Sequence, residues 1–452
     1  MNSAERFYCA LGGEIPDRVP TFTLGFDTKI IIELLLRLDI WPKLLRKLYR
    51  KINFYGNSIA TVLEGVQFRS PETGQKPLMR RAFPLEKYTQ SLWSMFVPSS
   101  YESVYSTLQL YLKTATGSKT DGTVLPGWPS FKFKGFVWQG DPDGGRYRKL
   151  VSEYNLATIF EEHGTPCAED PVLPPNRQFQ FLTEYFKDFD PTEQIQKILE
   201  PTLRNFEDKL GLVCWYSPGV YETWLETHGM TQMLPYFKDL FREYRESKRK
   251  PDYIGPFRAL LEAKTDMFMR HMKQYAEIGG RAVGFGEDIL TSRNAFIPPE
   301  VYEEFFIPYT RKCLDYARKL DLLTIFHTDG RWKQDNQDRP FLFLDHVAAT
   351  KPNGIHGFQA DCNNLLECKA HLESTRDSLD HSVVMVGGMD NNKIFSQPQS
   401  LQAIWKRTAN VLQNLKLPGP FIAATDHSYH YGVLVENITQ FNKAVWKYGR
   451  YD

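Results

Sequence analysis

The chain has 452 residues, 42% of them hydrophobic and 24% charged, and its 55 lysines and arginines are nearly balanced by 54 aspartates and glutamates. This balance creates no global field that would attract nucleic acid or an anionic membrane, so neither is an expected partner. The length suits one α/β barrel domain over residues 1–452, elaborated by an added segment.

Targeting and redox signals are weak. The N-terminus "MNSAERFYCALGGEIPDRVP" has no apolar core behind a basic start, and no segment has the roughly 20 apolar residues of a membrane span. The six cysteines include no CxxC pair, which favours free thiols in a reducing compartment. We therefore expect a cytoplasmic protein. Cys362 and Cys368 are either metal ligands or ordinary structural residues, and the second interpretation is favoured.

The N-terminal part begins with a predicted strand, "RVPTFTLGF", at residues 18–26, and continues with helical sequence over residues 29–52. Pro42 divides that sequence into an apolar helix and a basic amphipathic one. The basic helix fits either a membrane surface or packing on the barrel or a partner, and packing is favoured because no other membrane signal occurs. The apolar helix is compatible with a homodimer contact.

From about residue 111 to residue 171 the composition shifts to Gly, Pro, Trp and Tyr, and "GDPDGGRYR" has the character of a hairpin turn. We interpret residues 111–171 as a β-rich insertion in the N-terminal half. Helical sequence then returns at residues 191–211.

Short apolar runs recur in the C-terminal half, and they begin at Gly211, Arg281, Leu322, Asn353, Val383 and Phe421. After the second run, each run starts roughly 30 to 40 residues after its predecessor, which is the size of one strand–helix unit. Helical patterns fill the gaps. Along residues 298–320, for example, a stripe predicted to be buried recurs every four residues: Val301, Phe305, Tyr309, Cys313 and Ala317.

Strands alternating with helices at this period predict a parallel sheet, and apolar strands predict one that is covered on both faces. We therefore expect a (β/α)8 TIM barrel with the β-rich insertion. Nucleotide binding is disfavoured, because "VGFGEDI" lacks the third glycine of a dinucleotide fingerprint and no phosphate loop occurs.

Polar residues follow the predicted strands: Glu287, Asp288, His327, Asp329, Gln359, Asp361, Asp390, Asp426 and His427. The carboxyl ends of all barrel strands meet around one mouth, so these residues are expected to converge. Taken singly, an Asp after a strand commonly caps the next helix, and for Asp390 capping is as good an interpretation as function.

Two imidazoles and a carboxylate, from His327, Asp329 and His427, suit Zn²⁺ or another divalent metal with one position left open. Residues i and i+2 of an extended segment share a side, so His327 and Asp329 can both face the mouth. A metal-free alternative uses the same residues as general acid and base. The candidate catalytic residues are thus these three together with Glu287 and Asp288.

Three further strand-end residues, Tyr216, Gln359 and Asp390, are candidates for contacts with the substrate. Aromatic residues of the insertion either wall the pocket or form ordinary core, and the second interpretation is favoured.

The chain resembles the uroporphyrinogen decarboxylase-like barrels, which include the tetrapyrrole decarboxylase and corrinoid-dependent methyltransferases. The resemblance lies in the order of five motifs: "SAERFYCALGGEIPDRVP", "GEDILTSRNAFIPPEVYEEFFIPYTRK", "IFHTDG", "GGMD" and "ATDHSYHYGVLVENI". In the members that activate thiols, zinc is held by the His and Cys of an HxC strand end and by a Cys in the final segment. Here His327 matches the His, Asp329 replaces the first Cys and His427 falls on the second.

The departures narrow what the resemblance implies. The decarboxylase's arginine-rich "RQAGRY" motif is replaced by "LGFDTK", so uroporphyrinogen decarboxylation is not expected. No DxHxxG corrinoid motif occurs, so a corrinoid (cobalamin) would have to be supplied by a separate partner protein.

Our leading hypothesis is therefore a methyltransferase component that moves a methyl group from an oxygen-bound position, such as an aromatic methyl ether, to that corrinoid. The alternatives are a lyase or decarboxylase acting on a small carboxylated or hydroxylated substrate, and a non-catalytic binding protein on the same fold.

Overall fold

The structure is a computed structural model of the whole chain. Its described residues are 1–25, 34, 101–126, 133–140, 146–152, 157–160, 167–168, 175–223, 254–295, 297–334, 338–429 and 432–451. The predicted helices of residues 29–52 lie outside them except for Leu34, so the homodimer contact expected there stays a prediction. Within the described residues, no helix is long and apolar enough to cross a bilayer.

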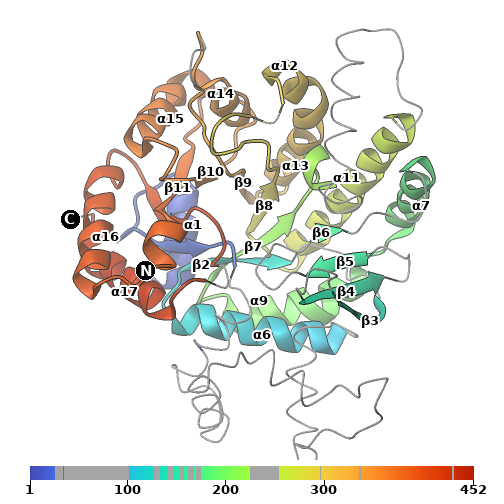
Figure 1. Ribbon diagram of the computed structural model, residues 1–452, viewed down its shortest axis with the longest axis horizontal. Helices are drawn as coiled ribbons and strands as arrows, with labels where there is room; N and C mark the ends of the chain where they lie inside the picture. Colours follow the sequence, from blue (N-terminus) through green and yellow to red (C-terminus); the bar gives the residue numbers. More distant parts are fainter. Residues whose placement is uncertain are drawn as a thin grey trace, which may run out of the picture.

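Eight parallel strands close into a barrel, in the order β1-β12-β11-β10-β9-β8-β7-β2 (Figure 1). These strands are β1 (Thr21–Thr23), β2 (Gly122–Pro126), β7 (Gly211–Tyr216), β8 (Ala282–Gly286), β9 (Leu323–His327), β10 (Gly354–Phe358), β11 (Val384–Met389) and β12 (Phe421–Thr425). The predicted first strand and all six predicted strands of the C-terminal half are present. The expectation of a (β/α)8 barrel is therefore confirmed.

Helices surround the strands, as expected for a sheet covered on its outer face (Figure 1). The α-helices are α1 (Ser3–Leu11), α6 (Tyr101–Gly117), α7 (Pro175–Asp188), α8 (Thr192–Gln194), α9 (Glu200–Phe206), α11 (Ile254–Glu277), α12 (Pro299–Val301), α13 (Ile307–Lys319), α14 (Leu342–Ala348), α15 (Leu365–Leu379), α16 (Leu401–Leu415) and α17 (Val435–Tyr448). Wider π-helical turns occur at η2 (Ile195–Leu199), η3 (Tyr302–Phe306) and η4 (Asn391–Phe395).

The predicted helix of residues 298–320 is a rod made of α12, η3 and α13. Pro308 has no N–H to donate, and the wide turn η3 directly precedes its helix. Because the wide turn breaks the regular period, Phe305 and Tyr309 of the predicted stripe are only half-buried, whereas its other members are buried.

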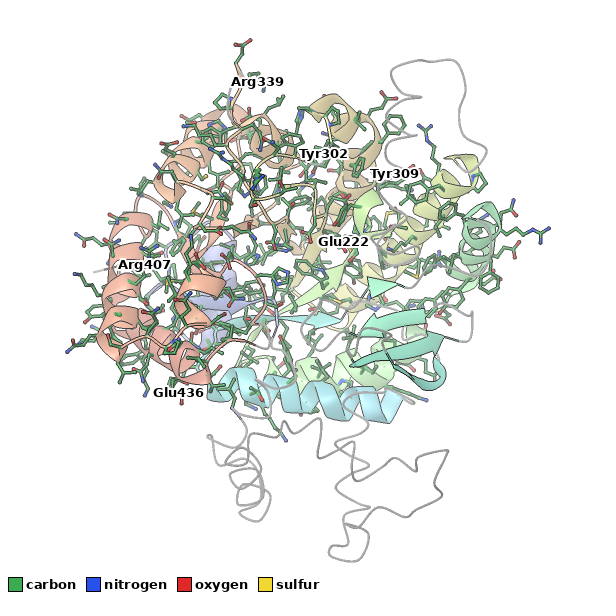
Figure 2. All side chains as sticks on the ribbon, in the orientation of Figure 1. Glu222, Tyr302, Tyr309, Arg339, Arg407 and Glu436 are labelled. Atoms are coloured by element: carbon green, nitrogen blue, oxygen red, sulfur yellow. The ribbon has the colours of Figure 1, made fainter. Side chains whose placement is uncertain are left out.

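Charged side chains such as Arg339 and Arg407 lie at the periphery of the molecule (Figure 2).

Helix α1 closes the N-terminal end of the barrel. A capping box starts the helix: Glu5 N donates to Asn2 Oδ1 at 2.8 Å, and Asn2 N donates to Glu5 Oε2 at 2.9 Å. The Phe7 ring then packs on the first residues of two strands, where a Cβ on Gly122 or Gly211 would lie 2.4 or 2.2 Å from it. Only glycine leaves room for this ring, so the strand starts and α1 fit one another.

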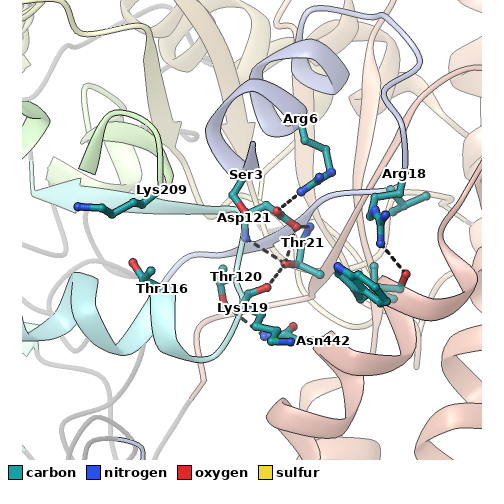
Figure 3. Close-up of a pocket in the computed structure, with 13 residues that line it drawn as sticks. Ser3, Arg6, Arg18, Thr21, Thr116, Lys119, Thr120, Asp121, Lys209 and Asn442 are labelled. Atoms are coloured by element: carbon teal, nitrogen blue, oxygen red, sulfur yellow. Dashed lines mark hydrogen bonds and ion pairs between the residues drawn. The ribbon is translucent and has the colours of Figure 1, made fainter. Parts of the chain in front are cut away.

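A buried polar network fixes α1 in place (Figure 3). The Arg6 guanidinium donates to Asp17 at 2.7 Å and to Asp121 at 2.8 Å. Asp121, just before β2, accepts in turn from the backbone N–H of Thr21 in β1 at 3.0 Å. The Arg6 charge is thus neutralised and hydrogen-bonded, as a buried cation requires. The network borders a cavity of 330 Å³ at this closed end, opposite the strand ends that carry the candidate site residues.

The β-rich insertion forms an antiparallel sheet in the order β3-β4-β5-β6. Its strands are β3 (Phe133–Gly140), β4 (Arg146–Ser152), β5 (Ala157–Phe160) and β6 (Cys167–Ala168). The predicted insertion is confirmed, but its predicted start near residue 111 is wrong. Residues 111–117 end α6, and Gly122–Pro126 is barrel strand β2. The sequence "GTVLP" does not predict a strand, because it begins with glycine and ends with proline, which are typical of loops.

Glycines shape the mouth of the barrel at two positions. Gly330, which follows β9, has a φ of +114°, and a Cβ there would lie 2.7 Å from backbone atoms of Leu290 and Thr291. Gly357 in β10 has a φ of +100°, and a Cβ there would lie 2.1 Å from the carbonyl oxygen of Thr328. Side chains are excluded from both positions, which brings the segments after β8, β9 and β10 close together.

We predict that Gly330→Ala lowers the free energy of unfolding by at least about 1–3 kcal/mol, because alanine meets both an unfavourable φ and a backbone clash. Urea unfolding followed by circular dichroism measures this change. Gly255→Ala is the matched control, since a Cβ on Gly255 in α11 meets no atom within 4 Å. The free energy of unfolding of this variant should be unchanged or slightly raised. Equal effects of the two substitutions would contradict this account of Gly330.

Candidate active site

Four polar side chains from three strand ends converge at the mouth of the barrel. His327 ends β9, Asp288 follows β8, and His427 follows β12. The Nε2 atom of His327 lies 3.6 Å from Asp329 Oδ1 and 3.8 Å from Asp288 Oδ1. His427 Nε2 lies 3.7 Å from the other oxygen of Asp329. Asp329 is therefore placed between the two imidazoles, as a bridging carboxylate.

The donor atoms of His327, Asp329 and His427 all lie within 4.8 Å of one another, and in the described part of the chain they form the one group of this kind. Bonds of about 2.0–2.2 Å to a tetrahedral zinc ion place two donors roughly 3.4 Å apart. The distances of 3.6 and 3.7 Å are close to that value, and they join the two imidazoles to the two different oxygens of Asp329. Oδ1 of Asp329 is also buried without a hydrogen-bond partner. This site thus fits a divalent ion in both geometry and donor chemistry.

The carboxylates of the site are held in an environment that opposes their charge. Burial raises the pKa of Asp329 well above its usual range, and the charges of Asp288 and Asp426 raise it further. Burial likewise raises the pKa of Asp288, against the attraction of His427 and a hydrogen bond from the Asp329 backbone N–H. Two neighbouring carboxylates with raised pKa values need either a proton or a cation between them.

The environment of the two imidazoles disfavours their charged forms. Burial lowers the pKa of His327 to about 3, and the neighbouring His427 contributes to the same effect. The pKa of His427 is lowered as well, by burial, against the opposing charge of Asp288. His427 keeps 39% of its side chain exposed and His327 only 6%, so solvent reaches the site from the side of His427. Neutral imidazole is the form that binds metal.

Glu287 occupies a different position from the other candidates. Its backbone N–H donates to the carbonyl of His327 at 3.0 Å, and its carboxylate accepts from the backbone N–H of Tyr221 at 2.8 Å. Gly219 leaves the space for this carboxylate, because a Cβ there would lie 1.1 Å from Glu287 Oε2. The side chain therefore turns toward the segment after β7 and supports the mouth from beside the imidazole cluster.

The predicted substrate contacts are not all at the mouth. Tyr216 faces outward from β7: it is fully buried, and its hydroxyl lies 2.8 Å from His271 Nδ1 in α11. Outward direction follows from strand alternation, because the preceding residue, Trp215, faces inward and its ring lies 5.9 Å from that of His327. The expectation of a substrate contact at Tyr216 is corrected accordingly, and Trp215 takes the position at the mouth.

Asp390 and Gln359 have local roles. The Asp390 side chain accepts from the backbone N–H of Lys393 at 2.6 Å and caps η4, so the capping interpretation describes what its side chain does. Gln359 Oε1 lies 3.7 Å from Cys362 Sγ. Cys362 and Cys368 take no part in the His/Asp cluster, and burial raises the pKa of each thiol to about 12. The two cysteines are ordinary structural residues.

The sequence interpretation did not include His356 of β10. This residue is fully buried inside the barrel, and its Nδ1 lies 2.9 Å from Nδ1 of His327. Its Nε2 lies 2.8 Å from the backbone carbonyl of Thr425 in β12. A histidine in the middle of the apolar run "NGIHGFQAD" is the signal that could have found it, since an inward polar residue there needs a partner.

Residues 252–448 match the family model described as uroporphyrinogen decarboxylase (URO-D). The C-terminal part of the chain is uroporphyrinogen decarboxylase-like. The match contains all of α11 and every strand from β8 to β12. It therefore includes His327, Asp329 and His427. The resemblance carried by the sequence motifs is confirmed.

Solved structures support the fold. A methyltransferase from Methanosarcina mazei aligns with a TM-score of 0.51 and 10% sequence identity, covering 99% of this chain and 99% of that chain. Dispersin B aligns with a TM-score of 0.26 and 12% identity, over 69% of this chain and 83% of its own, which is too low to support any argument. The comparison with curated proteins gave no match.

We predict a pH-dependent gain in stability for Asp426→Asn in the uroporphyrinogen decarboxylase-like region. Burial and the neighbouring Asp390 and Asp361 raise the pKa of Asp426 to about 7, against a hydrogen bond from the Asn391 backbone. The folded state then retains a proton that the unfolded chain loses near pH 4, so the wild type loses stability as the pH rises from about 4 to about 7. Asparagine removes that loss and can still accept from Asn391.

Urea unfolding in the presence of a chelator, at intervals from pH 5 to pH 8, measures this difference. The free energy of unfolding of Asp426→Asn, relative to that of the wild type, should rise with pH up to about pH 7 and then level off. The total rise should be no more than a few kcal/mol. A stability difference that is constant over this pH range would contradict the prediction.

Proposed function

We propose that the chain is the methyltransferase component of a corrinoid-dependent O-demethylating system. It would take a methyl group from an oxygen-bound position, such as an aromatic methyl ether, and pass it to a corrinoid carried on a separate protein. The URO-D match and the methyltransferase among the structural neighbours support an enzyme of the methyltransferase or decarboxylase type. The donor set of the candidate site supports the oxygen-bound substrate.

The observation that carries the proposal is the N/O donor set around the bridging carboxylate. His327 and His427 supply nitrogen and Asp329 supplies oxygen, and the set contains no thiolate. Such a set is harder than one with cysteine ligands and prefers an oxygen-bearing partner to a sulfur-bearing one. Zn²⁺ or another divalent metal held by these three residues would act as a Lewis acid toward a substrate oxygen.

The chemical need is set by the leaving group. When a methyl group departs without the bonding electrons, the oxygen keeps both and becomes an alkoxide or phenoxide, whose negative charge dominates the barrier. Asp288 lies beside the cluster, and burial raises its pKa, so in this proposal it would return a proton to that oxygen. Trp215 lines the mouth next to His327 and would help to keep water from the reacting atoms.

A metal-free lyase or decarboxylase is the second candidate function, and one observation favours it. The raised pKa values of Asp288 and Asp329 allow one proton to be shared at neutral pH, as in carboxylate pairs that act as general acids. In that case Asp288 or Asp329 donates a proton, and His327 or His427 accepts one. The substrate would be a small carboxylated or hydroxylated molecule.

The first test is metal binding. We predict that the purified protein binds one Zn²⁺ or Co²⁺ per chain, and that His327→Ala or Asp329→Asn weakens binding by at least about 10- to 100-fold, because each removes one of three donors. Competition with a coloured chelator measures the affinity, and the absorption of Co²⁺ reports its coordination.

The matched control is His371→Ala. His371 Nε2 lies 2.7 Å from Asp345 Oδ1, so this pair has the same residue types on helices α15 and α14, outside the mouth. Metal affinity should not change in this variant. The metal site would be contradicted if His371→Ala and His327→Ala lowered the metal affinity equally. It would also be contradicted if His327→Ala and Asp329→Asn each still bound one metal ion per chain with unchanged affinity.

The second test is turnover. We predict that the metal-loaded protein demethylates an aromatic methyl ether when reduced cobalamin is supplied, seen as the change in cobalamin absorption on methylation and as release of the phenol. His327→Ala should lower the rate at least 100-fold, because the leaving oxygen loses its stabilisation. Without cobalamin no phenol should form.

Other outcomes favour the other functions. Release of CO₂ or of an unsaturated product from a hydroxylated acid, without metal or cobalamin, would replace the methyltransferase by a lyase or decarboxylase. Ligand binding that is retained without turnover, in the wild type and in His327→Ala alike, would favour a non-catalytic binding protein.

A further inference from the structure

Three buried groups form a continuous chain beneath the candidate site. The carbonyl oxygen of Thr425 faces His356 Nε2 at 2.8 Å, and His356 Nδ1 faces His327 Nδ1 at 2.9 Å. Beyond the ring, His327 Nε2 points at the carboxylates of the mouth. The chain thus joins β12, β10 and β9 inside the barrel.

The positions of the protons in this chain follow from the chemistry of its ends. A carbonyl oxygen only accepts hydrogen bonds, so His356 Nε2 carries a proton and donates it to Thr425. His356 is fully buried, with Phe22 against its ring, and its two ring nitrogens face the Thr425 carbonyl and His327, so a second proton would place an uncompensated charge in the barrel interior. A neutral imidazole carries one proton, so Nδ1 of His356 is bare and accepts.

The hydrogen bond to His356 then fixes the tautomer of His327. Its Nδ1 lies 2.9 Å from a bare nitrogen, so Nδ1 carries the proton and donates it. Two bare nitrogens at this distance would repel each other and leave both rings without a buried hydrogen bond. When His327 carries one proton, that proton therefore lies on Nδ1, and Nε2 presents a lone pair to the mouth.

We propose that His356 is a positioning residue that holds His327 in the Nδ1-protonated tautomer, so that a bare Nε2 faces the candidate site. This gives His327 a definite role. It acts as a ligand or a proton acceptor through Nε2, and it has no proton to donate there. Any proton delivered to a departing group comes instead from a carboxyl group such as Asp288.

The arrangement also accounts for the demand for a cation at the mouth. A lone pair on His327 Nε2 lies 3.6 Å from Asp329 Oδ1, an oxygen that is itself buried without a partner. Two electron-rich atoms in this position are stabilised by an ion or a proton between them. The backbone carbonyl that anchors His356 lies only two residues before His427, so the same chain connects both histidines of the site.

Paired substitutions at residue 356 test the inference. His356→Asn keeps an acceptor oxygen near the position of Nδ1, whereas His356→Leu fills the space without any acceptor. In metal-free protein labelled with ¹⁵N in histidine, long-range ¹H–¹⁵N correlations report which ring nitrogen carries the proton. His327→Ala identifies the signals of His327. We expect a bare Nε2 in the wild type and in His356→Asn, and a mixed or Nε2-protonated ring in His356→Leu.

Metal affinity gives a second readout. His356→Leu should weaken Zn²⁺ or Co²⁺ binding by about 10- to 100-fold, as substitutions of groups that orient metal ligands commonly do, and His356→Asn should recover most of that loss. His271→Leu is the control, because His271 is also a buried imidazole with one hydrogen bond but lies in α11. It should lower stability without changing the tautomer of His327 or the metal affinity.

The inference rests on the proposed role of His327 in the site, but the two can fail separately. A wild-type His327 with a protonated Nε2 would overturn the inference, whatever metal binds. Metal affinity that is equal in His356→Leu and the wild type would overturn the positioning role. A wild type that binds no metal but shows a bare Nε2 would remove the metal-dependent function and leave the inference standing for a proton acceptor.

Discussion

The structure depends on closure of the barrel by one very short strand. β1 has three residues, yet it pairs with β12 on one side and with β2 on the other. Closure forces the carboxyl ends of β8, β9 and β12 around one mouth, although Asp288 and His427 are far apart in the sequence. Helix α1 and the Arg6–Asp121 ion pair seal the opposite end. The candidate site residues therefore lie together at the end of the barrel opposite α1.

Much of this arrangement could be predicted from the sequence, because strand alternation and the helical period are local properties. The apolar run that begins at Leu322 predicted a strand, and the spacing of His327 and Asp329 predicted that both face the same side. The sequence could not show that Gly122–Pro126 is a barrel strand, since its pairing with β1 and β7 is a long-range property and its composition is that of a loop.

The errors at single side chains have one common cause. Tyr216 ends a strand, as a residue of the mouth does, but the side chains of a strand alternate between its two faces, and the inward neighbour of Tyr216 is Trp215. His356 was overlooked because it lies within a strand and not at its end. Both follow from the alternation of inward and outward residues, which is visible once the register of β7 and β10 against their neighbours is known.

The barrel interior then explains why Asp329 matters more than its neighbours. Below it lie apolar side chains of the barrel interior, such as Ile325 and Val386, and the ring of His356, whose two nitrogens face His327 and the Thr425 carbonyl. The charge of Asp329 is therefore not compensated from beneath. An ion or a proton at the mouth would supply that compensation, so the binding of a cation and the neutralisation of a buried carboxylate would be one event. A cysteine here would bring a polarizable sulfur to that event. The oxygen of aspartate brings a harder donor, and this favours chemistry at a substrate oxygen.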